Sequence, residues 1–274
     1  MLMKSLPASP SPLLRHALLI AVALLIGWSL PPWAAAAADE GLPGKLLPAS
    51  ETRSLLRTID TIEMNGPVDL VVRQSAVPTL VVKSEQRLLE QIRTHQEGRT
   101  LSISVTGPTP ASYRPMRVEV GLPTLQYLRL AGTGDTQVSG LSGERLKLEQ
   151  SGRGDTVIRA TYENVEASLS GAGDFTLQSG PANSISLSIS GRGDARIDGR
   201  AKTFTASLRG SGDLNARALA AEVVTLALSG SGDALVTASQ AVTILSRGRG
   251  DVVVFGQPVQ KVLSRSGSGS VVFR

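Results

Sequence analysis

The sequence predicts an all-β protein built as a right-handed parallel β-helix, a solenoid of about 19–20 residues per coil. Three observations lead to this prediction. A Gly-x-Gly-Asp quartet recurs with its first glycines 18 to 20 residues apart, apolar and polar residues alternate on both sides of it, and almost no stretch has helical spacing. Because a coil of this length leaves no room for a helix, we expect successive coils to stack as parallel strands about 4.8 Å apart.

The first 38 residues have the layout of a secretory signal peptide. Lys4 and Arg15 come before or at the edge of an apolar run, Ala17–Leu30, which is followed by small residues suited to cleavage. The run is shorter than the roughly 20 residues that a membrane-spanning helix needs, so we expect no transmembrane segment in the mature chain. Residues 39–57 are polar and punctuated by Gly and Pro, which predicts a linker.

Residues 58–130 are expected to form irregular first coils that cap the same solenoid. Short alternating runs bounded by Gly and Pro predict strands throughout this segment. Gly66-Pro-Val-Asp69 has apolar neighbours at the same offsets as the later quartets, so we interpret it as a degenerate copy with Val68 in place of the second glycine. Residues 85–96 are the only stretch with helical spacing, which predicts one short helix.

Residues 131–274 contain the regular coils. Counted from the first glycine of each quartet, positions −6, −4, −2, +4 and +6 are mostly apolar and position +8 is small. Each coil should therefore hold an inward-facing strand, a turn at the quartet, a second inward-facing strand and a tight corner. The crossover rule for parallel strands favours the right-handed form. The predicted turn glycines are Gly132, Gly134, Gly152, Gly154, Gly171, Gly173, Gly191, Gly193, Gly210, Gly212, Gly230, Gly232, Gly248, Gly250, Gly267 and Gly269.

The quartet is interpreted first as a structural turn. Two glycines two positions apart allow positive φ twice, and an aspartate that closes the turn can accept hydrogen bonds from backbone N–H groups. Stacked coils would align the carboxylates in a ladder, with a repulsion of roughly 1 kcal/mol between neighbours even in water. Backbone N–H groups, an arginine or a cation must compensate. The predicted ladder consists of Asp135, Asp155, Asp174, Asp194, Asp213, Asp233 and Asp251.

Two other interpretations of the quartet stay open. A calcium ion bound along the ladder is one, although a single aspartate per coil supplies few of the roughly six to eight oxygens that the ion needs; the expectation is therefore no metal and no cofactor. Cell-adhesion signalling is the other, because Arg153, Arg192 and Arg249 each begin an Arg-Gly-Asp tripeptide. That position also holds Thr, Ala and Ser, so we interpret it as a permissive, solvent-facing slot.

The composition narrows the classes of function. The formal net charge of +5 falls to +3 without the two basic residues of the signal peptide, which is too small to indicate nucleic-acid binding. The chain has no Cys, so an exported form must be held by its own core. His95 is the only histidine after the signal peptide, and the carboxylates are spread one per coil rather than paired. We therefore predict no catalytic residues.

The segments "LSGSGDALV", "LSGAGDFTL" and "ISGRGDARI", with "IDTIEMNGPVDLVVRQ" before them, resemble the head GIN domain family of auto-transporter adhesins. The resemblance covers residues 58–274. It implies a right-handed parallel β-helix exported to the cell envelope, and it implies no catalytic residues. An auto-transporter also needs a long C-terminal translocator, and none follows the last quartet in this sequence. We therefore expect a periplasmic, cell-surface or secreted protein.

The functional expectation is an exported, non-enzymatic binding or structural module of the cell envelope, similar to an adhesin. The alternative is a β-helix that binds or modifies a polysaccharide. The expected partner is an envelope protein or a glycan. A second copy of the chain could also bind, because the final strand, Val271–Phe273, leaves an open edge that invites pairing.

Overall fold

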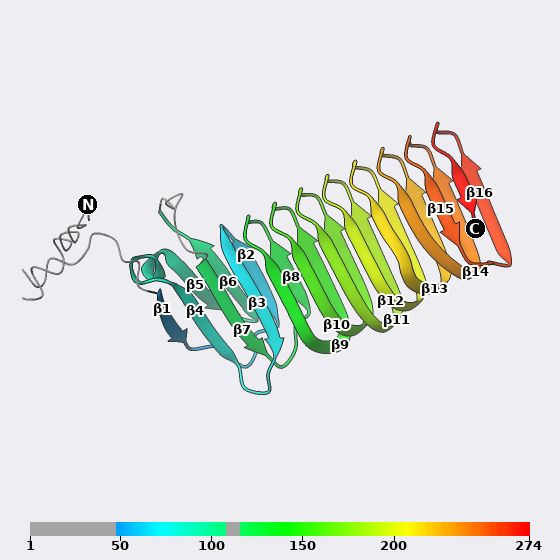
Figure 1. Ribbon diagram of the computed structural model, residues 1–274. Helices are drawn as coiled ribbons and strands as arrows, with labels where there is room; N and C mark the ends of the chain where they lie inside the picture. Colours follow the sequence, from blue (N-terminus) through cyan, green and yellow to red (C-terminus); the bar gives the residue numbers. More distant parts are fainter. Residues whose placement is uncertain (1–47, 108–115) are drawn as a thin grey trace, which may run out of the picture. The chain divides into compact units, whose positions relative to one another are not determined.

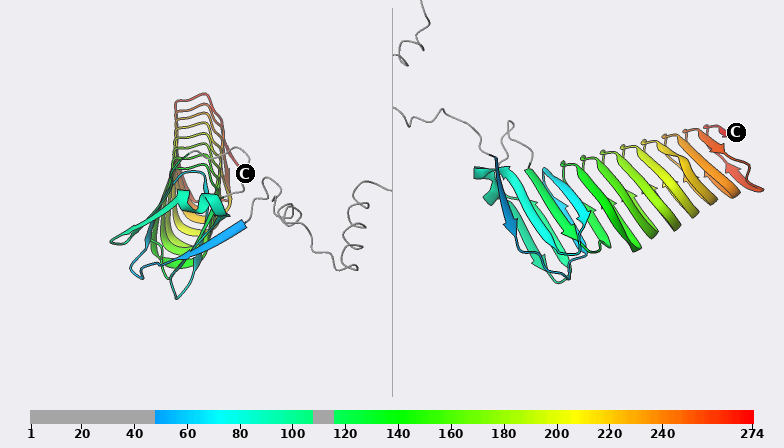
Figure 2. Two further views of the ribbon diagram at one scale, coloured as in Figure 1. Left: turned by 90° about the vertical axis from the view of Figure 1, so that its left-hand side faces the viewer. Right: turned by 60° about the horizontal axis from the view of Figure 1, so that its bottom comes forward.

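A computed structural model describes residues 48–107 and 116–274, which belong to one compact unit; the predicted signal peptide lies outside the described residues. Strands and turns make up this unit, apart from one short 3₁₀ helix. The coils stack in a row (Figure 1) and superpose when the unit is viewed along that row (Figure 2, left). The predicted parallel β-solenoid is therefore confirmed. In the described ranges no helix is long and apolar enough to cross a membrane.

From β9 to β14, each regular coil consists of a glycine turn followed by one long, bent strand, whereas the next coil is divided into β15 and β16 and the chain ends in the short strand β17. The two strands expected on either side of the small residue are continuous, and the corner is marked by a shift of register within the strand. Neighbouring strands pair in parallel along nearly their whole length. The strands are β9 (Thr136–Gln150), β10 (Thr156–Leu169), β11 (Phe175–Ile189), β12 (Ala195–Leu208), β13 (Leu214–Leu228), β14 (Ala234–Ser246), β15 (Val252–Phe255), β16 (Gln260–Arg265) and β17 (Val271–Phe273).

The core is a set of apolar columns that run along the stack. In one column Ile185 pairs with Phe204, Phe204 with Val224, and Val224 with Val242, and each of these side chains is almost fully buried. Because parallel strands in register place equivalent residues on top of one another, the alternation predicted from the sequence becomes a continuous apolar interior. The columns hold neighbouring coils together by excluding water between them.

The first coils are arranged in space in an order that differs from their order in the sequence. β2 pairs in parallel with both β6 and β8, and β3 pairs in parallel with both β7 and β9. The coil made by β2 and β3 therefore lies between the coil of β6 and β7 and the first regular coil (Figure 1). The strands are β2 (Thr61–Asn65), β3 (Val68–Gln74), β4 (Thr79–Glu85), β5 (Ile92–Glu97), β6 (Thr100–Val105), β7 (Met116–Leu122) and β8 (Tyr127–Leu130).

Two local expectations differ from the structure at this end. The predicted linker contains a strand, β1 (Pro48–Arg53), which pairs antiparallel with β4. The predicted helix over residues 85–96 is a 3₁₀ helix, η1 (Gln86–Gln91), followed directly by β5, which pairs antiparallel with β6. Both differences arise because exposed polar segments here satisfy their backbone groups against the outer strands, a tertiary effect that overrides local propensity.

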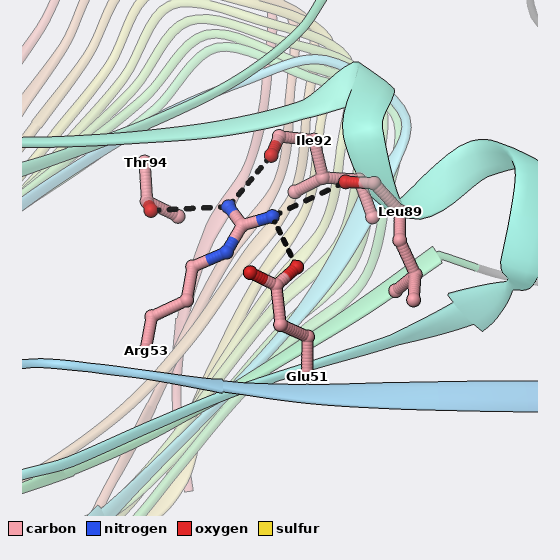
Figure 3. A network of polar contacts seen from close by, with 5 residues as sticks. All are labelled: Glu51, Arg53, Leu89, Ile92 and Thr94. Atoms are coloured by element: carbon pink, nitrogen blue, oxygen red, sulfur yellow. Dashed lines mark hydrogen bonds and ion pairs between the residues drawn. The ribbon is translucent and has the colours of Figure 1, made fainter.

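Arg53 fastens these added elements to one another (Figure 3). Its guanidinium donates hydrogen bonds to the backbone carbonyls of Ile92, at 2.7 Å, and of Leu89, at 3.2 Å. It also donates to the hydroxyl of Thr94, at 3.1 Å, and to Glu51, at 2.9 Å. The hydrogen bond from Arg53 lowers the pKa of the Glu51 carboxyl. One partly buried side chain thus joins β1 to η1 and β5.

Replacing Arg53 by Ala should lower the free energy of unfolding by roughly 1–3 kcal/mol, because two carbonyl oxygens and a hydroxyl lose a charged donor. Arg57→Ala is the matched control, since Arg57 is exposed and a substitution there should stay within about 0.5 kcal/mol. Urea unfolding followed by circular dichroism measures both variants. Equal stability of the two variants would contradict the role given to Arg53.

The last coil exposes more apolar surface than the others. Every residue of β16 is exposed, and Val259, Val262 and Leu263 rank among the large apolar side chains open to solvent. Val272 in β17 is also exposed. Self-association through this edge stays a prediction.

Candidate functional site

The glycine turns form a row along one edge of the stack (Figure 1). The sequence led us to expect positive φ at both glycines of each quartet, and this expectation is wrong. Among the described residues, the glycines with positive φ in the regular coils are Gly140, Gly199 and Gly256, all at the +8 corner, and none belongs to a quartet. The quartets therefore require glycine for another reason.

The reason is the close approach of backbone to backbone between coils. A Cβ on Gly210 would overlap the carbonyl oxygen of Gly191, and a Cβ on Gly212 would overlap the carbonyl oxygen of Gly193. The same relation holds from each quartet to the quartet one coil earlier, and it begins at the degenerate copy, where Gly132 lies against Gly66. Hydrogen bonds cross the same gap, such as the one from Ser211 N–H to Gly191 O at 3.1 Å. Each turn thus rests on the backbone of the turn before it.

Gly212→Ala should lower the free energy of unfolding by roughly 2 kcal/mol or more, because the backbone of the previous coil has no room to move away without breaking strand pairing. Ser211→Ala, at the exposed position next to it, should change stability by less than about 0.5 kcal/mol. Thermal unfolding of the two variants in parallel provides the measurement. If Gly212→Ala were as stable as Ser211→Ala, close stacking would not be what selects glycine.

The aspartates form the stacked ladder expected from the sequence, and backbone N–H groups hold it together. The carboxylate Oδ1 of each aspartate accepts a hydrogen bond from the backbone N–H of the aspartate in the next coil, over distances of 2.7–3.1 Å. Each of these bonds to a charged acceptor contributes roughly 1.5–3 kcal/mol. That exceeds the roughly 1 kcal/mol of repulsion between neighbouring exposed carboxylates. The ladder is therefore compatible with the fold without a cation.

Both ends of the ladder differ in chemistry from its middle. At the first end Asp69, from the degenerate quartet, accepts from Asp135 N–H, and Arg117 pairs in register with Asp69 with a nitrogen 4.0 Å from its carboxylate. At the last end Ser270 replaces the aspartate, and both its N–H and its hydroxyl donate to Asp251 Oδ1, at 2.7 and 3.0 Å. The ladder thus begins beside the positively charged side chain of Arg117 and ends at Ser270, which is uncharged and donates two hydrogen bonds.

These last two hydrogen bonds lower the pKa of Asp251 below its ordinary value of 3.8. A carboxyl whose pKa is lower in the folded protein than in the unfolded chain stabilises the fold above the unfolded value. That contribution is lost as the pH falls below 3.8 and through the folded pKa. Asp251→Asn removes this titration but keeps an acceptor oxygen.

The melting temperature of the unchanged protein should therefore fall more steeply below about pH 4 than that of Asp251→Asn. Glu144→Gln serves as the control, because it removes an exposed carboxylate outside the ladder. Thermal melts at a series of pH values decide the matter. Parallel pH profiles for the unchanged protein and Asp251→Asn would overturn this assignment.

The other interpretations of the quartet gain no geometric support. Among the described residues no group of three or more His, Cys, Asp or Glu side chains is placed to hold a metal ion. Calcium binding therefore rests on the ladder alone as the alternative interpretation, and the expectation of no metal stays a prediction. In the tripeptide from Arg192 to Asp194, the arginine and the aspartate line different hollows of the surface. His95 is exposed and 4.0 Å from Glu97, as a solvated histidine would be.

A groove runs along the row of turns on the side away from the carboxylates. We call it the arginine groove. It has a volume of about 790 Å³ and is lined by the residue before each quartet, the first glycine and the residue after that glycine. Its arginines are Arg153, Arg192, Arg209, Arg247 and Arg249, and its serines are Ser151, Ser170, Ser190, Ser211, Ser229 and Ser231. No acidic residue lines it.

The arginines of this groove are exposed and free. Within residues 48–107 and 116–274, none of the five guanidinium groups makes an ion pair or a hydrogen bond. From the sequence, Arg153, Arg192 and Arg249 were expected in a permissive, solvent-facing slot, and no role was predicted for Arg209 or Arg247. The sequence does contain a signal for the groove. The residues immediately before and after the first glycine of a quartet face the same hollow, so arginines at either position gather in one groove.

The sequence profile of a family described as "Putative auto-transporter adhesin, head GIN domain" matches residues 59–258. No protein of curated function matches the sequence.

Several solved structures share the fold. A "putative adhesin" from Parabacteroides distasonis superposes with a TM-score of 0.73 at 21% identity, over 84% of this chain and 98% of that one. A "putative adhesin" from Parabacteroides merdae gives the same TM-score and coverage at 18% identity. A "putative lipid binding protein" from Parabacteroides distasonis gives a TM-score of 0.71 at 22% identity, over 84% and 98% of the two chains. At these identities the likeness establishes the fold alone.

Proposed function

The chain belongs to the family described as "Putative auto-transporter adhesin, head GIN domain", and we propose that it is an exported, non-catalytic binding module of the cell envelope. Export is supported by the N-terminal sequence, in which a basic start, a short apolar run and small residues follow one another. The adhesin-like character is supported by the family and by the solenoid, which displays a long, repetitive surface.

The main support for a binding function is the arginine groove. Exposed guanidinium groups without partners keep their N–H donors available to a ligand, and they are more weakly hydrated than an ammonium group, which lowers the cost of binding. Protein surfaces usually intersperse both signs of charge, whereas this groove combines five arginines with serine hydroxyls and no carboxylate. The site is built for recognition by hydrogen bonding and charge.

Catalysis has less support from the same surface. The aspartates of the ladder are spread one per coil, and the Oδ1 of each aspartate from Asp69 to Asp251 accepts a backbone hydrogen bond from the next coil. This arrangement serves stacking and does not place two carboxylates across a bound substrate, as glycoside hydrolysis requires. Polysaccharide modification is the alternative function, and the polar lining of the arginine groove is compatible with a polysaccharide as its substrate.

The test is a glycan array together with binding to isolated envelope fractions, combined with assays of reducing-sugar release from every glycan that binds. Saturable binding without release is the expected result. Release of reducing ends would replace the proposal with the enzymatic alternative. Absence of binding to all glycans and to envelope fractions would overturn the proposed function altogether.

A further inference from the structure

The arginine groove is elongated along the stack of coils, and this shape indicates what kind of ligand it binds. Arg153 lies in the second regular quartet and Arg249 in the seventh, with Arg192 in the fourth quartet and Arg209 directly before the fifth. Five steps of about 4.8 Å separate the first from the last, which is roughly 24 Å along the stack. A single small anion would contact only one or two of these arginines. The arrangement suits an extended ligand that carries charge at intervals.

We propose that the arginine groove binds an acidic polysaccharide laid along the row of glycine turns, with the carboxylate or sulfate groups of the polymer on the arginines. This inference rests on the proposed binding function and names its ligand class. Guanidinium groups pair with carboxylate and sulfate through two parallel hydrogen bonds. The hydroxyls of Ser211 and Ser231 can exchange hydrogen bonds with sugar hydroxyls. The other four serines of the groove already donate to backbone carbonyls of the previous coil, so their hydroxyls can serve a sugar as acceptors.

The lining of the groove distinguishes this ligand from other anions. It contains no aromatic residue, and single-stranded nucleic acids are held by bases stacked on aromatic side chains. Its only apolar side chain is that of Ala172, so the groove offers nothing to insert between lipid chains, and its attraction to an anionic bilayer would be electrostatic alone. A hydroxyl-rich polymer with regularly spaced charges needs neither feature.

The aspartate ladder keeps the arginines available. Arg192 and Asp194 are two residues apart, yet the carboxylate accepts the N–H of Asp213 at 2.8 Å while the guanidinium has no partner. The backbone thus engages the carboxylates that could otherwise pair with the groove. The arginines and the ladder aspartates accordingly line separate hollows of the surface.

The experiment measures binding of polygalacturonate by calorimetry, with dextran as the neutral polymer. The unchanged protein should bind polygalacturonate saturably, bind dextran not at all, and lose affinity as the salt concentration rises from about 0.05 M to about 0.5 M. The double variant Arg192→Ala/Arg249→Ala should lose affinity by roughly tenfold or more, since two charge-assisted contacts disappear. Arg192→Lys/Arg249→Lys should fall between, because charge remains but the paired donors are lost.

The control is Arg200→Ala/Lys202→Ala, which removes the same charge from exposed positions in a separate hollow beside Glu163 and Glu222. It should leave the affinity unchanged, and thermal melts should show that both double variants remain folded. An equal loss in the control, equal binding of dextran, or no binding of polygalacturonate would overturn the inference. So would binding of anionic phospholipid vesicles or of single-stranded DNA in preference to polygalacturonate. Binding of a neutral glycan that the arginine variants do not weaken would overturn this inference while leaving the proposed function standing.

Discussion

The contact of backbone on backbone between successive glycine turns is the constraint on which the other features depend. With no Cβ at either glycine, the carbonyl oxygen of each turn lies directly against the next. This brings the turns to the spacing of paired strands. The strands that leave each turn then start in register, and the apolar columns continue from coil to coil. A side chain at one glycine would separate the turns and disturb the register of the strands that follow.

The aspartate ladder is a consequence of this spacing. When turns stack at strand distance, the carboxylate of one coil lies within reach of the backbone N–H of the next, and each unit gains a charged hydrogen bond. Repulsion between carboxylates then becomes a smaller effect than the bonds that align them. The carboxylates at the two ends of the ladder are compensated as well, because Arg117 lies beside Asp69 and Ser270 donates two hydrogen bonds to Asp251. The aspartate ladder therefore stabilises the stacking of the coils, and the arginine groove beside it is the candidate binding surface.

The surface on the other side of the turns follows from the same geometry. Side chains that flank the first glycine are exposed and lie outside the apolar core. Some serines before that glycine also donate to a carbonyl of the previous coil, whereas the arginines have no partner in the described residues. Arginine and serine occupy these positions, and the stacking converts residues about 20 positions apart in the chain into neighbours along one groove. A solenoid is suited to this use, because a small unit repeated in space presents the same chemistry at regular intervals.

The sequence by itself determined the coil length, the place of the turns, the inward-facing positions and the ladder of aspartates, because in a repeat each of these is a local pattern seen many times. Asp69 could be assigned to the ladder in the same way, since its neighbours kept the register. The tertiary structure alone decided the pairing of β1 with β4, the place of the β2–β3 coil between β6–β7 and the regular coils, and the reason for the glycines. These depend on contacts between segments far apart in the chain, such as Gly212 against Gly193 or Arg53 against Ile92. No local propensity encodes them.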